Sequence, residues 1–275
     1  MLFKLYRYLR ILSLDVALGS CISALFVANY LQVAISYSAL FTLGLCVWLI
    51  YTADHLMDAY HIKHKAHSRR HLYHQKYFKR LVYLFIVVAS LGFVSLIFLP
   101  TRTIYWGLAL LAFVFLHFII LKLIGIRPSA YKEFIVAFLY AAGIFLVSLS
   151  VYNGPFNKEI LVLFVQFFLT ALINLLLFGM IEEEIDKKDG QVSFVQWAGK
   201  KRTLTFTWIL LSISFCYPIY TFITTTNNSL IINQMIILAM NLTLGIIMFD
   251  KNYFKKKERY RAYGDAIFLY PIIVL

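Results

Sequence analysis

The sequence predicts an all-α polytopic membrane protein, a nine-transmembrane-helix bundle in which residues 1-275 form a single membrane domain. Of the 275 residues, 61% are apolar and only 14% are charged. The polar residues gather between long apolar runs instead of recurring with an amphipathic period. A bilayer core about 30 Å thick requires roughly 20 helical residues. Nine runs approach that length, near residues 11–31, 36–53, 80–99, 103–124, 132–151, 159–181, 204–225, 229–249 and 262–275, the last being short.

The first of these runs also resembles a lipoprotein signal peptide that ends at Cys21. Asp15 interrupts its apolar region, however, and the apolar residues continue past Cys21, so a membrane span is the better prediction. The remaining cysteines, Cys46 and Cys216, also fall inside predicted spans, where a thiol usually acts as a small apolar filler. No strand alternation typical of a membrane barrel is present, and lipid otherwise permits only helices.

The cations are sorted by loop. Alternate loops of a nine-helix bundle share a side, and five segments on one side hold 24 of the 26 lysines and arginines: residues 1–10, 54–80, 122–132, 187–202 and 251–261. The other loops hold only Arg102 and Lys158. The positive-inside rule places the N-terminus and the basic loops in the cytoplasm and the C-terminus outside a cell membrane. The net charge of +13 thus reflects membrane topology, and no nucleic-acid partner is expected.

Two pairs of carboxylates follow apolar runs on the predicted cytoplasmic side. Asp54 and Asp58 are spaced i, i+4 after the second run, and Glu182 and Asp186 repeat the spacing after the sixth. On a helix this spacing puts both carboxylates on one face. Four carboxylates that face one another would repel unless a cation lay between them.

The cation that suits these carboxylates is Mg²⁺, which takes one or two carboxylates and completes its shell with water and phosphate oxygens. A diphosphate meets that demand, and nearby cations are suited to neutralise its remaining charge. The candidate diphosphate-binding residues are Lys63, Arg69, Arg70, Lys132 and Lys188. A ligand with a charged head at the water edge and an apolar tail in the bilayer is an isoprenyl diphosphate.

The same residues resemble the motifs of the UbiA-type intramembrane prenyltransferases. IYTADHLMD, residues 50–58, is similar to the family motif Asn-x-x-x-Asp-Arg-x-x-Asp, and EEEIDKKDGQVS, residues 182–193, to Asp-x-x-x-Asp-x-Lys-x-Gly-x-x-Ser. RPSAYKEFIVAFLYAAG resembles a fifth helix that opens with a phosphate-binding lysine, here Lys132. The chain departs from the motifs at three positions, where Ile50 stands for asparagine, His55 for arginine and Glu182 for aspartate.

The resemblance implies a nine-helix fold and an Mg²⁺-dependent transfer of an isoprenyl group from a polyprenyl diphosphate to a lipid-soluble acceptor, usually an aromatic ring. It implies that the catalytic metal is held by Asp54, Asp58, Glu182 and Asp186 with Asp189 beside them. Two alternatives stay open. One is a diverged protein of the same fold that binds or transports a polyprenyl lipid without turnover, and the other is an unrelated transporter or membrane assembly protein.

The histidines suggest a different metal chemistry. Six of the seven lie within twenty residues, at His55, His61, His64, His67, His71 and His74. The HxxxH spacing of HSRRH is shared with membrane di-iron oxidases, but such enzymes draw their ligands from several loops, whereas the remaining histidine, His117, sits within a predicted span. We therefore expect a solvated, partly helical loop whose histidines are polar surface.

Overall fold

The computed structural model describes residues 2–124 and 131–275, so part of the predicted basic segment at 122–132 lies outside the described residues. The described chain is helical nearly throughout and has no strand. Its α-helices are α1 (Leu2–Ile11), α2 (Leu14–Tyr30), α3 (Tyr37–His61), α4 (Arg69–Lys76), α5 (Phe78–Ser95), α6 (Thr101–Ile124), α7 (Lys132–Leu149), α8 (Lys158–Asp189), α9 (Phe194–Ala198), α10 (Lys200–Thr224), α11 (Asn228–Phe249), α12 (Lys251–Lys255) and α13 (Arg259–Ala266). The 3₁₀ helices are η1 (Leu96–Phe98), η3 (Lys256–Glu258) and η4 (Ile267–Val274).

Over the residues whose side chains are described, six of these elements are long and apolar enough to cross a membrane: α3, α5 with η1, α7, α8, α10 and α11. Helix α2, with 17 residues, is apolar but shorter, and α6 is apolar over Thr101–Leu116, the part whose side chains are described. The last predicted run folds as α13 followed by η4. The prediction of an all-α polytopic membrane protein is confirmed, whereas the count of nine crossings stays a prediction.

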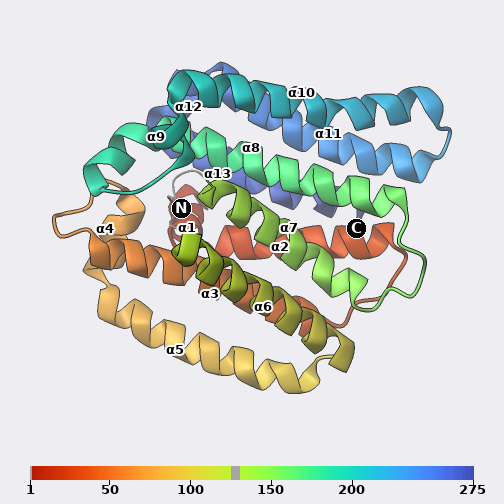
Figure 1. Ribbon diagram of the computed structural model, residues 1–275, viewed down its shortest axis with the longest axis horizontal. Helices are drawn as coiled ribbons and strands as arrows, with labels where there is room; N and C mark the ends of the chain where they lie inside the picture. Colours follow the sequence, from red (N-terminus) through yellow and green to blue (C-terminus); the bar gives the residue numbers. More distant parts are fainter. Residues whose placement is uncertain (1, 125–130) are drawn as a thin grey trace.

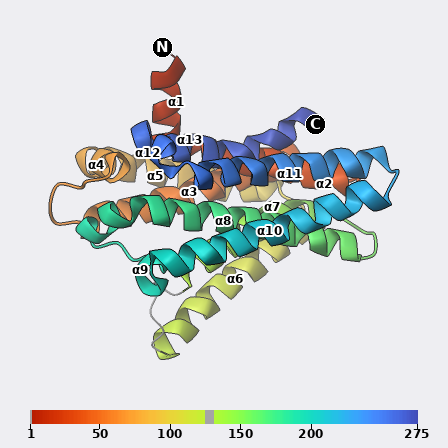
Figure 2. The same ribbon diagram turned by 90° about the horizontal axis from the view of Figure 1, so that it is seen from above.

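The long helices lie side by side and place the acidic termini of α3 and α8 at the same end of the bundle (Figure 1). We call this the acidic end and define it by Asp54, Asp58, Glu182 and Asp186. The short helices α4, α9, α12 and α13 lie at this end too, whereas Arg102 and Lys158 belong to the opposite end. Figure 2 shows α1 leaving the bundle on one side and α6 splaying from it on the other. The described acidic and basic loops therefore gather at this end, while the side of the membrane on which the end lies stays a prediction.

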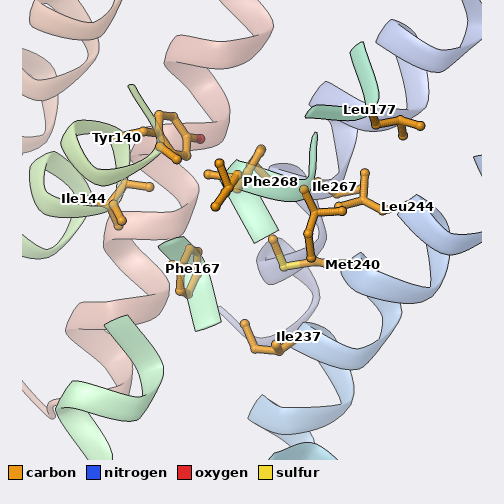
Figure 3. Packing of buried hydrophobic residues seen from close by; sticks show 14 of the residues in the cluster. Tyr140, Ile144, Phe167, Leu177, Ile237, Met240, Leu244, Ile267 and Phe268 are labelled. Carbon is orange, nitrogen blue, oxygen red and sulfur yellow. The ribbon is translucent and has the colours of Figure 1, made fainter. Parts of the chain in front are cut away.

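Helix α8 forms the centre of the bundle. In its most apolar window 61% of the residues are buried, against 11% in α5. Figure 3 shows Phe167 and Leu177 of α8 among side chains of α7, α11 and η4, with Ile144, Met240 and Phe268 as examples. Lipid is as apolar as these side chains, so van der Waals packing and interhelical hydrogen bonds drive helix association in a bilayer. The central position of α8 fixes its acidic terminus against several neighbouring helices.

A polar pair joins α8 to α11 inside this core. The amides of Gln166 and Gln234 exchange hydrogen bonds of 2.7 and 3.2 Å, and Thr170 donates to Asn241 at 3.3 Å. All four residues are buried. Hydrogen bonds of this kind fix the register of helices that apolar packing alone would leave free to slide.

Both acidic helices extend beyond the apolar runs that predict them. Helix α8 has 32 residues and spans about 48 Å at 1.5 Å per residue, which exceeds a bilayer core of about 30 Å. It ends at Gly190, whose φ of 70° lies in the left-handed region that favours glycine. Helix α3 likewise continues through Asp54 and Asp58 to His61. The carboxylates thus stand on rigid helix beyond the apolar segments, which fixes the faces they share.

Candidate functional site

The two carboxylates of α3 have only loose partners. The Asp54 side chain is 50% exposed, and its Oδ1 lies 3.9 Å from the Nζ of Lys132. Its Oδ2 lies 3.8 Å from the Nδ1 of His55. Asp58 is less exposed, and its Oδ2 lies 3.4 Å from the Nε2 of His71. These separations exceed ordinary charge-assisted hydrogen bonds, so both carboxylates retain lone pairs for a further ligand.

Glu182 of α8 is held much more firmly. The Nε of Arg261 donates to Oε1 at 2.6 Å, its Nη2 donates to Oε2, and the hydroxyl of Tyr260 also donates to Oε1. Both ends of the ion pair are largely buried, with side-chain exposures of 14% and 12%. Burial alone lowers the pKa of Arg261, but the Glu182 carboxylate raises that pKa well above its usual value. The resulting fork is a bidentate arginine–carboxylate pair.

Asp186, one turn further along α8, is partly buried and forms no ion pair with a described residue. It lies within electrostatic range of Glu182, Arg261, Arg70 and Lys132. Among the acidic residues at this end, Asp186 and Asp54 are the ones that least depend on protein partners.

Asp189 acts as an anchor. Its side chain is fully buried and accepts hydrogen bonds from the backbone N–H of His67 and Ser68, at 3.2 and 3.5 Å, and from the His67 ring at 2.7 Å. The His64 ring lies 3.2 Å away. These contacts tie the loop between α3 and α4 onto the end of α8. Asp189, which is predicted to lie beside the metal, therefore has a structural role in holding this loop.

Two of the five predicted diphosphate-binding cations interact with carboxylates of both acidic helices. Lys132 is 3.9 Å from Asp54 and interacts electrostatically with Asp58 and Asp186. Arg70 interacts with Arg261, Glu182 and Asp54, and its Nε is buried with no hydrogen-bond partner among the described residues. Burial lowers the pKa of Arg70, but a guanidinium stays protonated in proteins. A buried, charged donor without an acceptor is suited to receive an anion.

The other three predicted cations are placed differently. Lys63 stacks over the ring of Tyr60 at 4.7 Å and donates to its carbonyl. Arg69 lies 3.8 Å from Glu258, and Lys188 is exposed. Among the described residues, none of these three forms an ion pair with the four carboxylates of the acidic end.

The expectation that the histidines form polar surface is wrong for three of them. His55, His71 and His74 are 2%, 5% and 1% exposed, because α4 folds back against α3. Burial lowers the pKa of His74 to about 4, so this ring is neutral at pH 7. His61, His64 and His67 are exposed as expected. The burial of these rings depends on tertiary packing, which local polarity does not reveal.

Sequence reasoning also missed Tyr260 and Arg261, which it treated only as part of a basic loop. Their place depends on Gly264, where a Cβ would come within 2.5 Å of the Asn174 Oδ1 and 2.7 Å of the Phe178 ring. Helix α13 can lie against α8 only because this position carries no side chain. A glycine one turn after an arginine, just before an apolar run, was the available signal.

A separate pocket of about 490 Å³ lies between α8, α10, α11 and α12. Its lining includes Glu183, Glu184, Lys200 and Lys255. Its lining contains none of the four residues that define the acidic end, so this pocket is not the cavity in which those carboxylates would bind a ligand. We base the candidate site on the carboxylates, Lys132 and Arg70.

No protein-family model matches the chain, and no curated protein matches it in sequence. Solved structures do. Two structures of a UbiA homologue from Archaeoglobus fulgidus, bound to Mg²⁺ with DMAPP or GPP, match with a TM-score of 0.59 at 15% and 16% identity, over 97% of this chain and 98% of theirs. The chain has the UbiA fold. A digeranylgeranylglyceryl phosphate synthase also matches, with a TM-score of 0.53 and 17% identity over 98% of both chains.

The UbiA fold agrees with the resemblance carried by the two motifs. In this structure the position of the first asparagine, Ile50, is 67% exposed on α3. The position of the first aspartate of the second motif, Glu182, is bound by Arg261. The chain therefore shares the architecture while its acidic end has partners of its own.

Proposed function

We propose that this protein is an Mg²⁺-dependent intramembrane prenyltransferase that transfers an isoprenyl group from a polyprenyl diphosphate to a lipid-soluble acceptor. One observation carries the proposal: the acidic ends of α3 and α8 lie at the same end of a UbiA fold, with Lys132 and Arg70 in electrostatic contact with carboxylates of both. The solved neighbours with prenyl diphosphates and Mg²⁺ support the substrate class. The proposed orientation puts this end and the N-terminus in the cytoplasm.

The donor set fits Mg²⁺ in part. Asp54, Asp58 and Asp186 offer hard oxygen ligands whose lone pairs are not saturated by the protein, which is what Mg²⁺ requires. Glu182 has both oxygens engaged by Arg261, and Asp189 is occupied by the α3–α4 loop. We assign Asp54, Asp58 and Asp186 as the principal metal ligands. Glu182 is assigned to position Arg261.

Bound Mg²⁺ would supply charge stabilisation to the departing diphosphate. The chain's own cations share that task. Arg70 has a buried guanidinium N–H with no acceptor in the described part of the chain, and Lys132 stands at the start of α7 beside Asp54. Donors held in place before reaction stabilise charge that develops on a leaving group without reorganisation. The isoprenyl tail then lies along the apolar helices, where water cannot compete with the acceptor for the allylic carbon.

The test is a direct assay in lipid nanodiscs. Wild-type protein with Mg²⁺ and radiolabelled geranyl diphosphate, supplied with an extract of membrane lipids, is expected to release diphosphate and to label a lipid. Asp186→Asn should stop both. Glu184→Gln is the matched control, because Glu184 stands on the same helix but is 78% exposed beside Lys255. Equal turnover in Asp186→Asn and wild type would exclude the proposal.

A non-catalytic lipid-binding protein of the same fold is the second candidate. The observation that favours it is the occupation of Glu182 by Arg261, which removes one predicted metal ligand. This candidate predicts that geranyl diphosphate binds and is recovered intact after prolonged incubation with Mg²⁺ and lipid extract. The same nanodisc assay separates the two, because it measures bound and cleaved diphosphate independently.

A further inference from the structure

A cluster of two buried histidines and a carboxylate lies where α4 meets α3. His55 and Asp58 stand three residues apart on α3, and His71 comes from the first turns of α4. Their candidate ligand atoms all lie within 4.8 Å of one another. His55 and His71 are 2% and 5% exposed, so the geometry is fixed by the protein interior and not by a solvated loop.

The ring nitrogens of this cluster are not satisfied by the protein. Within the described residues, neither ring nitrogen of His71 has a hydrogen-bond partner of ordinary geometry; its Nε2 lies 3.4 Å from the Asp58 Oδ2, a long contact. The Nε2 of His55 contacts the Ser13 hydroxyl at 3.2 Å, and its Nδ1 forms no hydrogen bond with any residue that the structure describes. Buried polar groups are almost always bonded, so an unpaired ring nitrogen on each of these two buried histidines points to a ligand at this place.

We propose that His55, Asp58 and His71 bind a divalent transition-metal ion of borderline softness, with Zn²⁺ as the representative. Zinc bonds of about 2.0–2.2 Å to nitrogen and oxygen put neighbouring tetrahedral ligands about 3.4 Å apart, which is the separation of the His71 Nε2 and the Asp58 Oδ2. Mg²⁺ strongly prefers oxygen ligands, whereas imidazole favours transition metals. Binding of this ion does not require prenyl transfer, although the site shares Asp58 with the proposed Mg²⁺ site.

The surroundings of the two histidines match those of metal ligands. A ligating imidazole usually directs its other nitrogen at a carboxylate, a carbonyl or a water. The Nδ1 of His71 faces the Oδ2 of Asp189 at 3.8 Å, and the Nε2 of His55 is oriented by Ser13. Three protein ligands leave one tetrahedral position for water or a phosphate oxygen.

The charges around the cluster allow a cation. Arg70, His71, His74 and Arg261 act on His55 electrostatically. Against these stand Asp54, Asp58 and Asp189, each within 4 Å of a ring nitrogen of His55 or His71. Arg261 is already paired with Glu182, so these three carboxylates face two remaining cations, Arg70 and Lys132. A divalent ion therefore enters a site with a surplus of negative charge.

A second group, His64, His67 and Asp189, has similar spacing but is a weaker candidate. Its histidines are exposed, and the oxygens of Asp189 already accept from two backbone N–H groups. No ring nitrogen of this group is both buried and unpaired. It therefore supplies matched controls for the first group.

The first test uses the wild-type chain alone. Full-length protein in nanodiscs, stripped of metal and titrated with Zn²⁺, is expected to bind one ion that a hundredfold excess of Mg²⁺ does not displace. Zinc X-ray absorption should show two imidazole nitrogens with oxygen ligands. No tight binding, displacement by Mg²⁺, or a shell without imidazole would each overturn the proposal.

Variants then locate the ion. His55→Gln and His71→Gln should each weaken Zn²⁺ binding by about tenfold or more, since losing even an outer partner of a ligand commonly costs 10–100-fold. His61→Gln and His67→Gln, in the same segment, should bind as wild type does. A loss in His67→Gln with none in His71→Gln would place the ion in the second group and overturn the proposal. Thermal melting of each variant checks that it is folded. If a variant does not fold, the zinc X-ray absorption spectrum of the wild-type protein tests the proposal instead.

Discussion

Asp54 and Asp58 on α3 are spaced as Glu182 and Asp186 are on α8, yet the two helix ends differ in what surrounds them. On α3 both carboxylates have partners at 3.4 to 3.9 Å. On α8 the first carboxylate is clasped by Arg261 and Tyr260 and the second has no ion-pair partner in the described part of the chain. The i, i+4 spacing puts both carboxylates of a pair on one face of their helix. The elements that pack against that face then decide whether a carboxylate binds a protein group or remains available for a ligand.

The comparison predicts that the α8 pair contributes most to stability. Arg261→Ala should lower the free energy of unfolding by about 3–5 kcal/mol, because it leaves the largely buried Glu182 charge unpaired. Asp54→Asn should cost less than about 1 kcal/mol, since its pair with Lys132 is exposed. Unfolding monitored in mixed micelles would measure both. A similar loss in the two variants would remove the distinction between the helix ends.

At the end of α3 we expect the opposite balance, with a small loss of stability and a large loss of activity. Asp54→Asn is expected to lower the rate of diphosphate release by roughly 10²–10³-fold, the usual cost of removing one group that stabilises developing charge. Its melting temperature should stay close to that of wild type. The measurement is single-turnover release of diphosphate at saturating Mg²⁺, with Glu184→Gln as the unchanged reference. Full activity in Asp54→Asn would exclude α3 from the metal site.

The sequence predicts the features of this site that depend on local residues, and it does not predict those that depend on tertiary packing. Apolar run length and loop charge predict the helices and the end at which the carboxylates gather, because both depend on local composition. The spacing of Asp54 and Asp58 also predicts their shared face. The role of Glu182 was not predictable, since its partner Arg261 lies 79 residues away. The burial of His71 was likewise hidden, because it depends on α4 folding back onto α3.

Two neighbouring arginines, Arg69 and Arg70, allow an exposed cation of the α4 helix to be compared with a buried one. Arg70→Ala should weaken binding of geranyl diphosphate by roughly 10–100-fold, the equivalent of about 1.5–3 kcal/mol for a hydrogen bond to a charged group. Arg69→Ala should change it less than about twofold, because Arg69 is 56% exposed beside Glu258. Equilibrium binding in nanodiscs with Mg²⁺ tests both. Equal losses would mean that the loop acts only through its general positive charge.

The smallest expected effect concerns the glycine that lets α13 reach α8. Gly264→Ala should cost about 1–3 kcal/mol, because its Cβ would overlap the Asn174 amide and the Phe178 ring. Gly107→Ala is the matched control: its Cβ meets nothing within 4 Å on α6, so alanine should be neutral or stabilise by up to about 1 kcal/mol. If α13 holds Arg261 in place, Gly264→Ala combined with Arg261→Ala should cost less than the sum of the two single changes. Strict additivity would show that Gly264 and the ion pair act independently.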